Sequence, residues 1–225
     1  MRRVPTRRRL LRAASELFAE RGFHGTTVRD IAARAGVNLA SGNYHFGSKK
    51  ELYLEVLRTQ FAEIRAELER RGARVAEAEL GRMSRPELER LLQARIGAML
   101  ELLIGPPPGL HGALMQREMT DPSEALPMIA AEFIRPMKRE MQQILSHLVP
   151  ELDGRDLEHC IFSIVGQVLH YRAAMPLLLE LLGRSQYPRS FAAELADHIT
   201  EFSLGGMARL VARRPRRERG QRHAG

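Results

Sequence analysis

Apolar residues recur along most of this 225-residue chain at the three-to-four-residue spacing of an amphipathic helix. Leu10, Ala14, Leu17 and Phe18 form one such series, and Leu52, Val56, Phe61 and their neighbours begin a longer one. The strict alternation that is typical of a half-buried strand is almost absent. The periodicity therefore predicts an all-α protein.

Capping residues divide the first seventy positions into three short helices and one long helix. Thr27 stands three residues before Asp30, and Ser48 stands three residues before Glu51, which is the spacing of a capping box at a helix N-terminus. Gly22 and Gly36 end the first two helices. The expected ranges are 6–22, 27–35, 38–45 and 48–72.

Further start and stop signals follow a charged linker. Ser84 opens a helix that three consecutive prolines end after Gly105, because proline lacks a backbone donor and has a fixed φ. The remaining expected ranges are 84–104, 110–119, a helix that is kinked or broken at Pro136, then 154–182 and 188–212.

Charge is distributed unevenly along the chain. The formal net charge is +8, and residues 1–50 hold 11 Lys/Arg against 3 Asp/Glu. The balance is −5 over residues 51–212 and +5 over residues 213–225. Arginine makes up most of the cations, which is a common effect of genome base composition, but composition does not explain why the surplus lies at the two ends. A basic N-terminal segment followed by an acidic segment predicts that the first binds a polyanion and the second does not.

Composition argues against several classes of protein. Cys160 is the one cysteine, which leaves no internal disulfide, and we expect it to be a small buried apolar residue. The histidines form no pair at the i, i+4 spacing of a metal site, and no catalytic constellation is visible, so we expect no metal, no cofactor and no enzymatic activity. No apolar stretch approaches the roughly 20 residues that span a bilayer, and no signal peptide is apparent. These features predict a cytoplasmic protein without a membrane partner.

Two short helices joined by a tight glycine turn describe a helix-turn-helix. The second helix of such a pair lies in the major groove of DNA. Here residues 38–45 are rich in small and hydrogen-bonding side chains, which suits close approach to base edges. The candidate phosphate contacts are Tyr44 and His45 at the end of that segment, and Ser48 and Lys49 at the start of the next helix.

The runs from Phe23 to Asn38 and from Asn43 to Leu52 resemble the DNA-binding domain of TetR/AcrR regulators. The resemblance covers residues 6–55. It implies that ten positions meet operator DNA, namely Thr27, Arg29, Asn38, Leu39, Ala40, Ser41, Asn43, Tyr44, His45 and Lys49. We expect three parts in the chain: a DNA-binding domain at 1–50, a helical ligand-binding and dimerisation domain at 51–212, and a basic disordered tail at 213–225, which is rich in arginine and has no apolar face.

The segment from Met115 to Glu124, with Ile134-Arg-Pro136 after it, is similar to the ligand domain of the CecR-type branch. This implies a response to a small molecule. The candidate pocket residues are Met99, Leu103, Met115, Arg117, Met119, Met137, Met141 and Phe162. The methionines have a second interpretation as ordinary core, and Arg117-Glu118 is either a surface pair or a polar anchor in the pocket. Gln167, His170 and Arg172 line either the pocket or a subunit interface.

The last two long helices are apolar on a broader surface than one subunit covers. We expect a four-helix homodimer interface that includes Ile161, Val165, Gly166, Leu195, Ile199 and Phe202. The function predicted for the chain is that of a homodimeric repressor, which binds a palindromic double-stranded operator and is released by a small-molecule ligand. The alternative is an architectural protein that binds DNA without regard to sequence.

Overall fold

The computed structural model describes residues 5–38, 46–105 and 110–213, and all regular structure in these ranges is helical. The expected all-α fold is confirmed. The elements are α1 (Thr6–Arg21), α2 (Val28–Ala35), α4 (Lys49–Arg70), α5 (Glu77–Leu80), α6 (Arg85–Ile104), α7 (Leu110–Thr120), α8 (Leu126–Ile129), the π-helical turn η1 (Ala130–Ile134), α9 (Arg135–Leu148), α10 (Gly154–Ala173), α11 (Met175–Leu181) and α12 (Phe191–Arg213).

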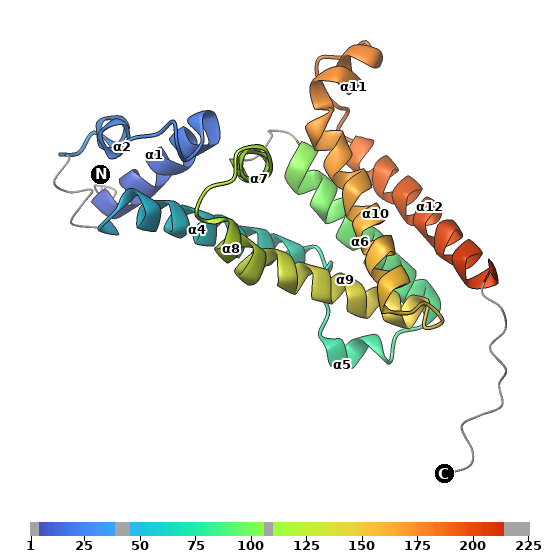
Figure 1. The fold of residues 1–225 in the computed structure, drawn as a ribbon. Coiled ribbons are helices and arrows are strands. Elements are labelled where there is room, and N and C mark those ends of the chain that lie inside the picture. The colour runs from blue at the N-terminus through green and yellow to red at the C-terminus, as the bar shows by residue number, and fades with distance from the viewer. Residues whose placement is uncertain (1–4, 39–45, 106–109, 214–225) are drawn as a thin grey trace.

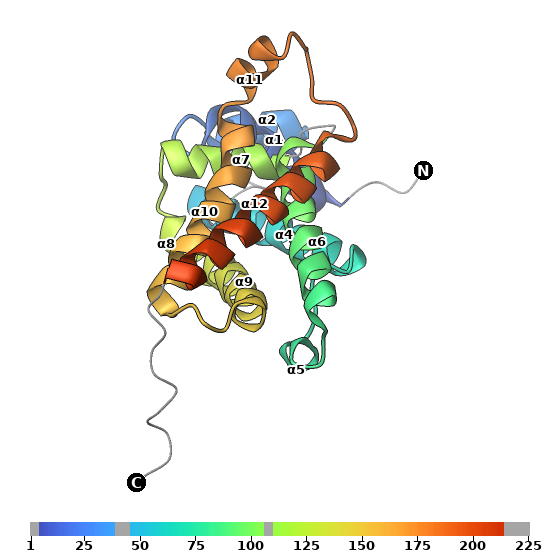
Figure 2. The same cartoon turned by 90° about the vertical axis from the view of Figure 1, so that its right-hand side faces the viewer.

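The helices gather into two regions that α4, α7 and the α8–α9 run connect (Figure 1). In the first, α1 and α2 pack on the start of α4, and we call these three helices the N-terminal unit. In the second, α6, α9, α10 and α12 pack against one another, and α12 lies along the outer side of α6 and α10 (Figure 2).

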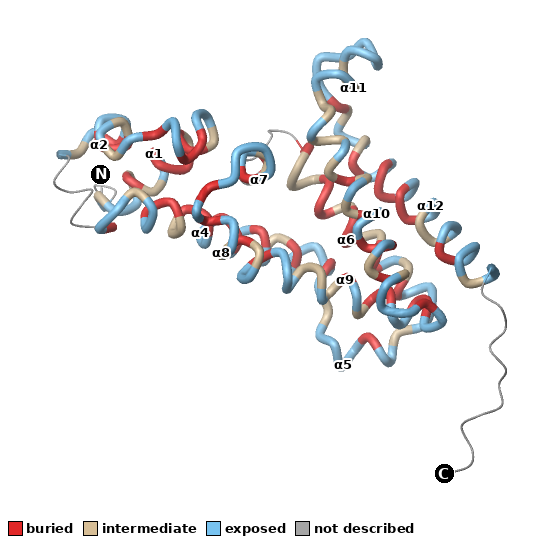
Figure 3. Tube along the Cα trace, in the orientation of Figure 1, coloured by how far each residue is buried: buried red, intermediate tan, exposed pale blue. Residues whose placement is uncertain are grey.

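Each region has its own hydrophobic cluster, and the buried positions follow the inner faces of the helices (Figure 3). The first cluster joins α1, α2 and α4 to Leu114 of α7, Ile129 of α8 and Phe133 of η1. The second cluster joins α5, α6, α9, α10 and α12. Apolar packing therefore continues from the N-terminal unit along α4 into α7 and α8, while α10 and α12 belong to the other core.

The expected single helix over 154–182 is wrong. It divides into α10 and α11, which are bent by 72° at Ala174. Pro176 lies in the first turn of α11, and an unbroken helix would place its ring against the carbonyl group of Arg172. The apolar pattern runs through this position, but the backbone does not continue straight.

Pro136 produces no break. The chain stays helical from Leu126 to Leu148, and the five residues of η1 form a wider π-helical turn just before α9. Pro136 then falls in the first turn of α9, where its missing donor is tolerated. The short helix α5 lies within the expected charged linker, and α12 begins three residues after Pro188. The expected helix at 38–45 and the tail at 213–225 lie almost entirely outside the described residues.

In the part of the chain that the structure describes, no single helix is long and apolar enough to cross a bilayer. Among the described helices, the bent pair of α10 and α11 passes that test when its two members are counted together.

Candidate nucleic-acid interface

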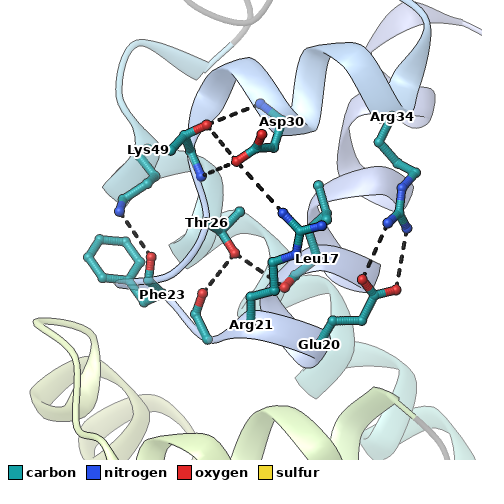
Figure 4. Close-up of polar contacts among 10 residues, drawn as sticks. Leu17, Glu20, Arg21, Phe23, Thr26, Asp30, Arg34 and Lys49 are labelled. Atoms are coloured by element: carbon teal, nitrogen blue, oxygen red, sulfur yellow. Dashed lines mark hydrogen bonds and ion pairs between the residues drawn. The ribbon is translucent and has the colours of Figure 1, made fainter.

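The start of α2 is fixed by the capping box that the sequence predicts. Thr27 Oγ1 accepts a hydrogen bond from the Asp30 backbone N–H at 3.1 Å, and Asp30 Oδ2 accepts one from the Thr27 backbone N–H at 3.2 Å (Figure 4). The Thr27 hydroxyl group also donates to Asp30 Oδ2 at 2.7 Å, and this bond, together with the one from the Thr27 backbone N–H, holds the pKa of Asp30 below its usual value. The preceding Thr26 is buried and donates to the Gly22 carbonyl oxygen at 2.8 Å. The side chains thus set where the first helix of the pair begins.

The turn after α2 requires glycine. Gly36 has a φ of +63°, in the left-handed region, and the Val37 N–H bonds back to the Ala32 carbonyl oxygen at 3.0 Å. Arg9 Nη2 of α1 donates to the Gly36 carbonyl oxygen at 2.8 Å, and a Cβ on Gly36 would lie only 2.8 Å from that same nitrogen. Arg9 therefore ties the turn to α1, and the sequence offered no signal for this role beyond its charge.

Helix α2 is held on α1 by an apolar face and an ionic edge. Ile31 has no exposed surface, and Ala32 and Ala35 are buried beside it. Arg34 forms ion pairs with Glu20 at 3.3 Å and Glu16 at 3.4 Å, the first of which Figure 4 shows. The apolar contact sets the orientation of α2, since exposed ion pairs contribute little.

A second capping box begins α4 immediately after the described gap. Ser48 Oγ accepts from the Glu51 N–H at 3.1 Å, and Glu51 Oε2 accepts from the Ser48 N–H at 3.0 Å. Lys49 is turned back into the protein: its Nζ donates to the Phe23 carbonyl oxygen at 2.9 Å and lies 4.2 Å from the centre of the Phe23 ring. Two of its three donors remain for a phosphate.

The expected DNA contacts divide into two groups. Thr27, Arg29 and Asn38 are exposed, and Arg29 makes no ion pair within the described ranges. Lys49 is partly buried. Leu39, Ala40, Ser41, Asn43, Tyr44 and His45 lie outside the described residues. The structure thus places the exposed members of the set at the two ends of α2.

A capped α2 followed by a left-handed glycine turn, with α1 and α4 on a common core, is the described part of what the sequence predicts as the helix-turn-helix of a DNA-binding transcription regulator; the second helix of that motif, expected at 38–45, lies outside the described residues. Two family models match the chain. One is described as "Bacterial regulatory proteins, tetR family" and covers residues 10–56. The other is described as "HTH-type transcriptional dual regulator CecR, C-terminal domain" and covers residues 88–207, more than half of the chain. The chain belongs to the TetR family of DNA-binding transcriptional regulators and has a CecR-type C-terminal domain, so its family is one of regulators and not of enzymes.

Similar proteins extend the comparison over both regions. The chain is 27% identical to the HTH-type transcriptional dual regulator CecR of Shigella flexneri over 77% of this chain and 78% of that protein. It is 30% identical to the HTH-type transcriptional regulator TcmR of Streptomyces glaucescens over 73% of this chain and 71% of that protein. The crystal structure of the transcriptional regulator FadR from Bacillus subtilis, in complex with stearoyl-CoA, has the same fold, with a TM-score of 0.65, 18% identity, and coverage of 88% of this chain and 98% of that chain.

The candidate pocket residues do not meet at one place. Met99 and Met141 are buried in the second cluster and Leu103 packs on it, Met115 packs on the first, and Met137 packs on both. Met119 and Phe162 are 57% and 56% exposed, and Arg117 donates to a backbone oxygen of α1. A hollow of about 430 Å³ is lined by residues 183–189 and by none of the candidates.

The candidate interface residues also separate. Ile161, Leu195 and Ile199 are buried within their own chain, and Ile199 has no exposed surface. A side chain in that position has no area left for a second copy, so the faces of α10 and α12 expected from the sequence need correction. Val165 is partly buried, whereas Gly166 and Phe202 are exposed. The large apolar residues that α10 and α12 leave exposed are Phe162, Phe202 and Leu210.

Proposed function

We propose that this TetR-family regulator is a homodimeric repressor, which binds a palindromic operator and is released by a small-molecule ligand. The observation that carries the proposal is the exposed apolar surface on α10 and α12, with Phe202 66% exposed. Large exposed apolar side chains on neighbouring helices are typical of an interface. Gly166, Gly205 and Gly206 on the same two helices have open space where a Cβ would stand, which allows close approach of another helix.

A two-fold dimer explains how a small DNA-binding unit reaches useful affinity. One helix-turn-helix makes few contacts, whereas two units held about 34–36 Å apart meet successive major grooves on one side of the duplex. The N-terminal unit supplies Thr27, Arg29, Asn38 and Lys49 as contacts, together with residues 39–45. We retain the division into residues 1–50, 51–212 and 213–225 as part of this proposal.

Two similarities support a ligand. The Bacillus subtilis FadR structure, which shares the fold, was solved with stearoyl-CoA, and the match to the CecR C-terminal domain covers residues 88–207. Within this chain, Met99, Leu103, Met137 and Met141 lie in or against the second cluster. Methionine adapts to irregular apolar ligands, so this cluster is the proposed pocket wall.

Release follows from a shift of populations. A ligand that prefers the dimer whose N-terminal units are wrongly spaced weakens operator binding, and it does so only by its difference in affinity for the two states. Coupling of about 1–3 kcal/mol corresponds to a roughly 5–150-fold loss of operator affinity.

Selection from a random DNA pool with the full chain tests the proposal, with sedimentation of the free protein as the second measurement. A palindromic selected sequence and a dimer at micromolar concentration support it. Equal affinity for every duplex, with a steep salt dependence, would instead indicate an architectural DNA-binding protein. A monomer that binds a single half-site tightly would refute the dimer.

A further inference from the structure

Two adjacent residues of α7, Arg117 and Glu118, reach the N-terminal unit from outside it. Glu118 Oε1 accepts a hydrogen bond from the Tyr53 hydroxyl group of α4 at 2.6 Å. Arg117 Nη2 donates to the carbonyl oxygen of Glu20 in the last turn of α1 at 2.6 Å, and its Cδ lies beside Gly22. One turn of α7 therefore holds two different helices of the N-terminal unit at the same time.

The Glu118 contact is buried. Glu118 is 2% exposed, and its second oxygen, Oε2, accepts from the Ser123 backbone N–H at 3.1 Å. Tyr53 is equally buried, and its ring packs edge-on against Phe18 of α1 with centroids 4.6 Å apart. Burial, with Glu118 beside it, raises the pKa of Tyr53, so its hydroxyl group keeps the proton that it donates. A buried hydrogen bond to a carboxylate is among the stronger polar contacts, and loss of one partner leaves the other unsatisfied.

The opposite end of α7 contacts the second region. A Cβ on Gly112 would lie 3.2 Å from the carbonyl oxygen of Leu103 in α6 and 3.5 Å from Nε of Arg172 in α10. This end of α7 therefore lies close to both α6 and α10. Since α10 belongs to the proposed dimer face, α7 makes contacts on both sides, with a helix of that face and with the N-terminal unit.

We propose that Arg117 and Glu118 are positioning residues for operator binding: they set the orientation of the N-terminal unit relative to α6 and α10, and through it the distance between the two recognition elements of a dimer. This rests on the proposed homodimer and palindromic operator. The role differs from both interpretations of the Arg117-Glu118 pair drawn from the sequence, since Glu118 is not on the surface and neither residue faces the second cluster.

The chain offers a matched control for the experiment. Lys50 of α4 forms an ion pair with Glu124 at 2.6 Å, which also joins the N-terminal unit to the segment after α7. Both side chains of this pair are exposed, so it contributes little to orientation. Glu118→Gln and Glu124→Gln make the same chemical change at a buried and at an exposed contact across the same boundary.

The experiment measures affinity of the full-length protein for the selected operator, for the same operator with two base pairs added between its half-sites, and for a single half-site. The wild-type protein and Glu124→Gln should prefer the original spacing. In Tyr53→Phe and in Glu118→Gln, the ratio of the affinities for the original and the lengthened operator should fall about tenfold, with half-site affinity unchanged. Tyr53→Phe keeps the aromatic ring that packs on Phe18.

If Tyr53 and Glu118 only stabilised the fold, their substitution would lower thermal stability but leave the preference for the original operator spacing unchanged. If Tyr53→Phe and Glu118→Gln lower thermal stability but keep the full preference, the positioning role is wrong and the dimer stands. If Glu118→Gln fails to fold, Tyr53→Phe still decides between these results. A wild-type protein with no spacing preference would overturn the palindromic operator and this inference together.

Discussion

Replacing Phe202 by alanine is expected to weaken the dimer about 100-fold without destabilising the chain. An aromatic side chain has roughly 150–250 Å² to bury, and Phe202 leaves 66% of its surface exposed. Covering that remainder corresponds to about 3 kcal/mol at roughly 25 cal/mol per Å². A two-fold interface buries Phe202 of both copies. Part of this free energy is offset because side chains lose freedom on association, so we take the contribution of one Phe202 as the expected loss of dimerisation free energy.

Sedimentation over a range of protein concentrations measures this change as a shift in the dimer dissociation constant. Leu177→Ala is the matched control, because Leu177 is 61% exposed but lies on α11, whose axis is bent by 72° from that of α10. The control should dimerise as the wild-type protein does. A Phe202→Ala protein with unchanged dimer affinity, or a Leu177→Ala protein that loses as much, would refute the assignment of this face.

Three substitutions and one labelling experiment test the packing and the caps. Ile199→Glu should unfold the chain rather than only separate a dimer, since Ile199 is fully buried; circular dichroism at low protein concentration would detect this. Thr27→Ala should cost about 1 kcal/mol in urea unfolding while Thr27→Ser retains the cap. The pKa of Asp30 is lowered in the folded chain, so its contribution to stability is present above its unfolded pKa and is lost as the pH falls through the folded value. In Asp30→Asn, the urea midpoint should therefore fall less steeply than in the wild-type protein as the pH is lowered through this range. Burial raises the pKa of Cys160, so a thiol reagent should modify it slowly in the native state and quickly in urea, and equal rates would contradict its burial.

The helix starts were predictable from sequence because they depend on contacts between neighbouring residues. In the Thr27–Asp30 and Ser48–Glu51 caps, the two partners are three positions apart in the sequence. The left-handed turn at Gly36 depends on a single glycine, which adopts a positive φ without strain. Pro176 was an equally local signal, but the apolar pattern through α10 and α11 concealed it. A pattern of side chains reports which surfaces are apolar, and it does not report whether the backbone continues straight.

The candidate interface shows where local patterns fail. Helices α10 and α12 are apolar on several faces, and which face turns inward depends on where α6 and α9 lie. That placement buries Ile161 and Ile199 and leaves Phe162 and Phe202 exposed, a choice that residue spacing along one helix does not contain.

The sequence by itself determined the helical fold, most helix boundaries and the helix-turn-helix, because caps, turns and apolar periodicity act within a few residues of one another. The tertiary structure alone decided the roles of Arg9, Tyr53 and Glu118. Tyr53 and Glu118 are 65 positions apart in the chain and meet only because α7 packs against α1 and α4. A buried hydrogen bond between two residues so far apart in the chain depends on the whole fold that brings them together.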